Sequence, residues 1–220
     1  MIGLPRFVHR YLDPGSRLGE ILFGLIMALG IIGAVRLGVE DLSNRSMFIA
    51  ILGCNIAWAI VDGVMYVLVD LFEQGRRHRL ARQIQAETDD GKALALIQGE
   101  LSGQVEPLCS PELLKLFYAD VLKNVRGANP LKVTLQKETV LGGIASAFVI
   151  LVATAPILVP YLVIPNARNA VRVSEAIAVV LLFFLGVWWA RVVGAHPIKV
   201  GLGLTAIGGV LVGITILMGG

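Results

Sequence analysis

Charged side chains are scarce in this chain of 220 residues. Asp, Glu, Lys and Arg make up 16% of it, whereas soluble globular domains typically contain about 25% charged residues. Apolar residues make up 56% of the chain, and the mean hydropathy is +0.77. This composition excludes a disordered or collagen-like protein and favours an integral membrane protein. The 25 glycines suit the close packing of membrane helices.

Cysteine is also scarce, and the motifs of several enzyme classes are absent. Cys54 lies in an apolar stretch and Cys109 in a polar one, so we expect two free thiols and no disulfide framework. The sequence has no P-loop, no HExxH zinc motif and no GxGxxG that follows a strand. The three histidines are isolated and lack the spacing of metal ligands. We therefore expect neither an ATP-driven pump nor an enzyme.

Five apolar stretches are each about 20 residues long, the length of a helix that crosses the hydrocarbon core of a bilayer. They cover residues 18–39, 47–71, 139–162, 173–193 and 200–218. Pro156 and Pro160 each remove a backbone donor from the third stretch and should kink or end its helix near the far side. The predicted fold class is an all-α integral membrane protein with five transmembrane helices.

The positions of Lys and Arg predict the orientation of these spans. With the N-terminus in the cytoplasm, 15 of the 19 basic residues fall in inner segments, and Arg36, Arg45, Arg168 and Arg172 remain outside. This asymmetry follows the positive-inside rule, so the C-terminus is predicted to lie outside or in a lumen. The basic run 76–79 directly follows a span and is interpreted as its cytoplasmic anchor, so no nucleic-acid partner is expected.

The sequence divides into four segments on this basis. They are a cytoplasmic N-terminal segment (1–17), helices 1 and 2 (18–71), a cytoplasmic helical insert (72–138) and helices 3 to 5 (139–220). Within the insert, the second span is expected to continue as helix over 76–86, and shorter helices are expected over 93–101 and 111–126. Ser110 as cap, Pro111 at the first helical position and Gly127 at the end indicate the last of these.

Asp62 is the ionisable residue nearest the middle of a span, where a charge costs about 2.5–3.5 kcal/mol on insertion scales. Helical spacing places Asn55, Trp58, Met65 and Tyr66 on its face. Carboxylate oxygens with a thioether suit a divalent transition metal, and a carboxyl group can equally carry a proton. Alternatively, Asp62 is a neutral acid that hydrogen-bonds a neighbouring helix and only stabilises packing.

Three further acidic residues belong to this part of the chain. Asp70 follows Asp62 by eight residues and is expected at the cytoplasmic mouth. Glu20 and Glu175 begin spans and are expected to face solvent, and a role at the entrance of a path is the alternative for Glu20. In the last span, Gly209 and Gly213 have small-xxx-small spacing, which is typical of close helix contact or a dimer face.

The chain resembles the vacuolar iron transporter family. The resemblance rests on 20–24 (EILFG) at the start of span one, Asp62-Gly63 followed by Asp70, and 196–202 (HPIKVGL) before the glycine-rich last span. Two positions depart from the family pattern: Met27 stands where the family has an aspartate, and Tyr66 where it has a methionine. The insert contains no methionine.

The resemblance implies a homodimer whose first spans line a path for ferrous iron or manganese, moved out of the cytoplasm against protons. It also implies that cytoplasmic carboxylates gather metal, and the candidates are Glu87, Asp89, Asp90 and Glu100. No tightly bound cofactor is expected, because the metal is cargo and H⁺ is the coupling ion. The membrane would be the plasma membrane of a prokaryote or the vacuolar or another organelle membrane of a eukaryote.

The leading hypothesis is therefore a proton-coupled divalent metal transporter in a lipid bilayer. Its predicted metal-site residues are Asp62, Met65, Asp70, Asn55, Tyr66 and Met27, with Glu20 at the path entrance. One alternative is a dimeric membrane scaffold that does not transport and presents the insert to a cytoplasmic partner. Another is a carrier that uses the same path for a different small solute.

Overall fold

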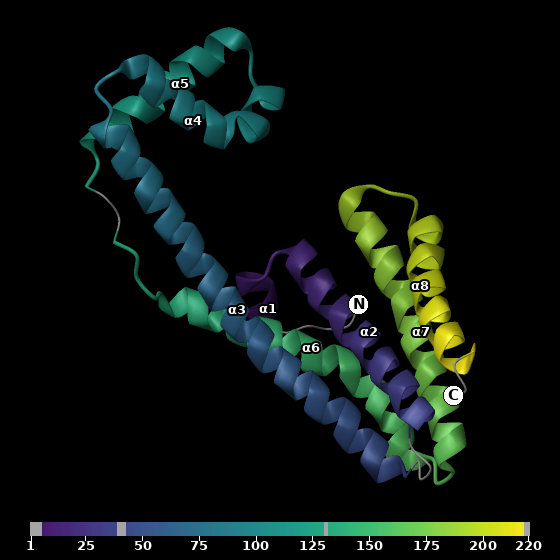
Figure 1. Cartoon of the computed structure of the whole chain (residues 1–220). Coiled ribbons are helices and arrows are strands. Elements are labelled where there is room, and N and C mark those ends of the chain that lie inside the picture. The colour runs from purple at the N-terminus through teal and green to yellow at the C-terminus, as the bar shows by residue number, and fades with distance from the viewer. Residues whose placement is uncertain (1–5, 39–42, 130–131, 218–220) are drawn as a thin grey trace. The chain divides into compact units, whose positions relative to one another are not determined.

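The structure is a computed structural model that describes residues 6–38, 43–129 and 132–217. It is built from helices, and these ranges contain no strand, so the predicted all-α fold is confirmed. Figure 1 shows the elements along the chain. They are α1 (Arg6–Tyr11), α2 (Pro14–Gly38), α3 (Asn44–Ala86), α4 (Asp90–Val105), the 3₁₀ turn η1 (Glu106–Leu108), α5 (Pro111–Gly127), α6 (Lys137–Val163), α7 (Ala167–Val193) and α8 (Pro197–Leu217).

The five predicted spans are confirmed as helices that are long and apolar enough to cross a membrane, namely α2, α3, α6, α7 and α8. Some begin earlier than hydropathy indicated, because polar caps precede their apolar parts. Asp13 accepts hydrogen bonds from the backbone of Gly15 and Ser16 at the start of α2, and Asn166 caps α7. The predicted ends of the first and last spans, Val39 and Met218, lie outside the described residues.

The chain forms two compact units. The apolar unit comprises residues 1–67 and 137–220, and the polar unit comprises residues 68–136. In the apolar unit, α2 packs against α6, α7 and α8, and α7 packs against α2, α6 and α8. Its core is aliphatic along the facing sides of these helices and includes Leu18, Leu25, Ile32, Ile51, Val149, Ile157 and Leu182.

Two pairs of glycines bring helices of the apolar unit into backbone contact. A Cβ added to Gly143 would lie 2.5 Å from the carbonyl oxygen of Gly63, so α3 and α6 touch at this point. A Cβ added to Gly186 would lie 2.7 Å from the Cα of Gly201, so α7 and α8 touch in the same way. By contrast, nothing lies within 4 Å of a Cβ added to Gly209 or Gly213, so the predicted small-residue motif makes no close helix contact within the described residues.

Neither proline of the third span ends its helix. Pro156 and Pro160 both lie inside α6, which continues to Val163. Each proline removes only one N–H donor, and the helix is supported on either side by packing against α2 and α7. The side chain of Ser174 adds a link between α7 and α6 by donating to the carbonyl of Ile157 at 2.6 Å.

The polar unit packs the end of α3 against α4 and α5. Its small core consists of Ile84, Ala93, Ile97, Tyr118 and Leu122. The predicted continuation of the second span to Ala86 is confirmed, and so is the helix that begins at Pro111 with Ser110 as its cap. Helix α4 is longer than the predicted 93–101 because Asp89 caps it at its start.

We expect Gly143→Ala to destabilise the apolar unit. The new methyl group would meet the backbone of Gly63, and a backbone cannot rotate away as a side chain can, so the cost should be about 1–3 kcal/mol. Gly53→Ala is the matched control because nothing lies within 4 Å of its added Cβ. The thermal midpoint of the full-length protein in detergent should fall for Gly143→Ala only, and equal midpoints would contradict the contact.

Candidate functional site

Two half-buried carboxyl groups from different apolar helices meet in the apolar unit. They belong to Glu20 on α2 and Asp62 on α3, and we call them the carboxyl pair. The hydroxyl of Ser146 on α6 donates a hydrogen bond to Asp62 Oδ2 at 2.5 Å. The carboxyl group of Glu20 lies against the same two side chains. Three helices therefore contribute to one polar site.

The glycine contact between α3 and α6 explains why Ser146 reaches Asp62. Asp62 directly precedes Gly63, and Ser146 lies one helical turn after Gly143. The backbone contact between these two glycines therefore sets the hydroxyl and the carboxylate at hydrogen-bonding distance. Glu20 reaches them from α2 beside the buried Ile21.

The electrostatics of the carboxyl pair call for a bound cation or a proton. Oε2 of Glu20 is buried and has no hydrogen-bond partner among the described residues. Neither acid forms a salt bridge within the described part of the chain. Two carboxylates that share an apolar environment cannot both stay charged at low cost, so a shared proton or a divalent cation would stabilise them.

A pair of sulfur atoms lies further along the contact between α2 and α3. The thiol of Cys54 donates to the thioether sulfur of Met27 at 3.7 Å, and we call these residues the sulfur pair. Between the two pairs, the rings of Phe23 and Trp58 are 6.2 Å apart. Seven residues on α2 separate the carboxyl pair from the sulfur pair, which is about 10 Å along the axis.

The other residues predicted around Asp62 have different surroundings. Asn55 is fully buried and donates to the carbonyl of Ile51 at 2.9 Å, and its Oδ1 has no partner among the described residues. The hydroxyl of Tyr66 donates to the backbone carbonyl of Tyr11 at 3.1 Å. The side chain of Met65 is 49% exposed.

Asp70 belongs to the polar unit. Its Oδ2 accepts a hydrogen bond from Gln74 at 2.9 Å. Gln74 in turn accepts from the backbone N–H of Thr134 at 3.2 Å. Asp70 therefore takes part in holding the segment after α5 against α3.

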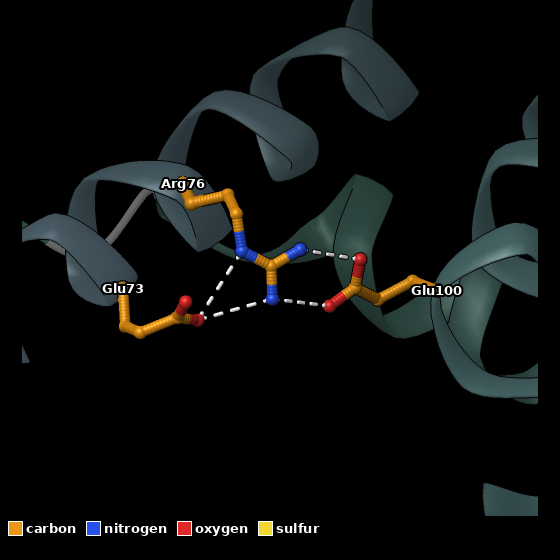
Figure 2. Close-up of polar contacts among 3 residues, drawn as sticks. All are labelled: Glu73, Arg76 and Glu100. Carbon is orange, nitrogen blue, oxygen red and sulfur yellow. Dashed lines mark hydrogen bonds and ion pairs between the residues drawn. The ribbon is translucent and has the colours of Figure 1, made fainter. Parts of the chain in front are cut away.

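The four acids predicted to gather metal in the insert are engaged in caps and ion pairs. Glu100 forms an ion pair with Arg76 at 2.6 Å, as Figure 2 shows, and Glu73 binds the same guanidinium. Asp90 pairs with Arg126 at 2.6 Å. Asp89 caps α4, and Glu87 accepts from the backbone N–H of Asp89. Across the described ranges, no three His, Cys, Asp or Glu side chains converge as a metal site.

Sequence reasoning missed two features of the site. Glu20 and Glu175 were expected to face solvent, and this is wrong, because Oε2 of Glu20 is buried and Glu175 is only 9% exposed. Both helices begin earlier than hydropathy indicated, so each acid lies a turn or more inside its helix. Ser146 was also missed, because a single serine in an apolar span carries no signal of its own.

Comparison with known proteins gives one match. A family model described as the VIT family matches residues 72–220, which is more than half of the chain. The match covers the polar unit from Phe72 onward together with α6, α7 and α8, and it begins after Asp62. No curated protein matches the chain.

The ion pair of Glu100 predicts a pH dependence of the polar unit. The guanidinium of Arg76 lowers the pKa of the Glu100 carboxyl below its ordinary value of 4.5. A lowered pKa means that the pair stabilises the fold above about pH 4.5 and that this contribution is lost as the pH falls through the folded-state value. Glu100→Gln should therefore speed amide hydrogen exchange in α4 at pH 7 relative to the wild type.

The same comparison at a pH well below 4.5 should show little difference, because the wild-type carboxyl is then also neutral. Glu112→Gln is the matched control, since Glu112 is exposed in the first turn of α5. An unchanged α4 exchange rate in Glu100→Gln at pH 7 would show that the ion pair stabilises nothing measurable.

Proposed function

The chain belongs to the VIT family, and from this premise we propose that it moves iron or manganese out of the cytoplasm in exchange for protons. Family membership implies transport of metal ions across a membrane. The identity of the metal, the coupling to protons and the direction are our proposal. So is the role of the carboxyl pair, because the matched range begins after both of its residues.

The observation that carries the proposal is the half-buried carboxyl pair between apolar helices. Carboxylate and hydroxyl oxygens are ligands that suit Mn²⁺ and Fe²⁺. Glu20, Asp62 and Ser146 offer such oxygens from three helices, and one oxygen of Glu20 has no partner in the described chain. Water would complete the coordination, since these three side chains supply fewer ligands than such ions usually take.

The same pair explains how metal and protons could compete. A divalent cation neutralises both carboxylates, and protons neutralise them when the metal leaves. An empty site with two charges in apolar surroundings is costly. Exchange of metal against protons therefore avoids the state of highest energy, and this is the physical basis of the proposed coupling.

The sulfur pair supports a preference for transition metals over magnesium or calcium. Thioether and thiol ligands bind softer ions than carboxylates do. Met27 and Cys54 lie two helical turns from the carboxyl pair, along the same contact of α2 with α3. The other predicted ligands of the metal remain predictions, and they are Asn55, Tyr66, Met65 and Asp70.

The orientation and assembly of the protein are also proposed. The distribution of basic residues favours a cytoplasmic N-terminus and a cytoplasmic polar unit. Gly209 and Gly213 on α8 have open space beside them and are spaced for close helix contact with a second copy. A homodimer is thus the assembly we propose.

One observation favours the scaffold alternative. Several leucines of the polar unit are strongly exposed, among them Leu108 (83%) in η1 and Leu113 (53%) and Leu116 (70%) one turn apart on α5. Exposed apolar residues that lie close together are typical of surfaces that bind another protein. A non-transporting scaffold would use this surface and would not need the carboxyl pair.

Metal flux into proteoliposomes, measured together with a proton-sensitive dye, separates these functions. The wild type should move Fe²⁺ or Mn²⁺ with an opposite flow of protons. Asp62→Asn and Glu20→Gln should each lower the rate by roughly tenfold or more, which corresponds to about 1.4 kcal/mol or more of activation free energy. Glu138→Gln is the control, because it removes one charge of the same kind at an exposed position of α6.

Normal flux in both Asp62→Asn and Glu20→Gln would exclude the carboxyl pair as the site. Absence of flux in the wild type would favour the scaffold. Flux of another small solute without metal flux would favour the third hypothesis.

Cadmium binding tests the sulfur pair separately. In a Cys109→Ser background, Cys54 is the remaining thiol, and added Cd²⁺ should produce a cadmium–thiolate absorption band in the ultraviolet. Met27→Leu in this background should weaken Cd²⁺ binding, because the neighbouring thioether is lost. A band that is unchanged by Met27→Leu would show that the two sulfurs do not act together.

A further inference from the structure

A hollow in the polar unit is lined by one face of α3. It is an open depression with a volume of about 440 Å³. The residues that line it are spaced three or four apart along α3, so they lie on one face of the helix. The residues are Gly75, His78, Arg79, Arg82, Gln83 and Ala86, and we call this feature the basic hollow.

The cationic side chains of the basic hollow are not used by the fold. Arg76 and Arg126 elsewhere in the polar unit are neutralised by carboxylates. Arg79 and Arg82 form no ion pair within the ranges that the structure describes. The same helix thus holds one arginine that stabilises the polar unit and two that are free to bind a ligand.

One polar atom of the lining residues is buried and lacks a hydrogen-bond partner among the described residues. This atom is Nδ1 of His78. Because Nδ1 is covered, His78 would contact a ligand through the part of its imidazole that lines the hollow. Gly75 adds space at one end, since nothing lies within 4 Å of a Cβ built on it.

This lining selects an anion and excludes a metal cation. No carboxylate is among the six lining residues. Two guanidinium groups one turn apart can each give paired N–H donors to the oxygens of a phosphate. The imidazole of His78 and the amide of Gln83 add neutral or charged donors beside them.

We propose that the basic hollow binds a phosphate group, held by Arg79, Arg82 and His78. Two sources present this chemistry, the headgroup of an anionic lipid and a soluble phosphate. The position in the chain favours the lipid, because α3 is one helix that carries an apolar stretch and then this basic face. Basic residues directly after a span attract anionic lipid headgroups. The inference does not depend on the proposed transport of metal.

Thermal unfolding of the full-length protein in detergent tests this inference with three probes. They are dioctanoyl phosphatidic acid, dioctanoyl phosphatidylcholine with the same chains but no net charge, and inorganic phosphate. We expect phosphatidic acid to raise the midpoint of the wild type in a saturable manner, and phosphatidylcholine to have no such effect. The double variant Arg79→Gln/Arg82→Gln should weaken the apparent affinity by roughly tenfold or more.

Arg77→Gln is the matched control, because Arg77 belongs to the same basic run and is exposed but does not line the hollow. It should keep the wild-type affinity, whereas His78→Ala should weaken binding. If inorganic phosphate alone stabilises the protein and the double variant abolishes this, the site takes a soluble phosphate. The proposal would be overturned if neither phosphatidic acid nor inorganic phosphate stabilised the protein. It would also be overturned if Arg77→Gln weakened the affinity as much as Arg79→Gln/Arg82→Gln does.

Discussion

The backbone contact of α3 with α6 at Gly63 and Gly143 is the constraint on which the site depends. It leaves no room for a side chain between the two helices. Because the helices touch there, the hydroxyl of Ser146 one turn away reaches Asp62. Glu20 from α2 completes the site. The polar groups of the site are therefore held by helices whose close packing comes from other contacts, such as Gly63 with Gly143. A site built on such helices is more rigid than one built on loops.

The two units use their acidic residues in different ways. In the polar unit, Glu100, Asp90 and Asp89 are satisfied by arginines or by backbone N–H groups and stabilise the fold. In the apolar unit, the carboxyl pair lacks such partners among the described residues. Unpaired charge in apolar surroundings is expensive, and this is why we place the proposed cation site at the carboxyl pair.

Much of the fold followed from residues that act locally. Runs of apolar residues predicted the five long helices, and Ser110 with Pro111 predicted the start of α5, because capping depends on neighbours in the chain. The pairing of Glu20 with Asp62 could not be predicted in this way. It depends on which faces of α2 and α3 meet, and that is decided by tertiary contacts such as Phe23 with Trp58 and Met27 with Cys54. The placement of Asp89 and Glu100 in a cap and an ion pair likewise required the tertiary structure.

The contact between Gly186 and Gly201 limits how the apolar unit can move. The two backbones touch at this point, and α7 and α8 are joined by a short turn in which Gly194 has a left-handed conformation. Sliding of α7 along α8 would therefore break the contact. A conformational change of the apolar unit that keeps this contact moves α7 and α8 together, as a pair of helices and not one along the other.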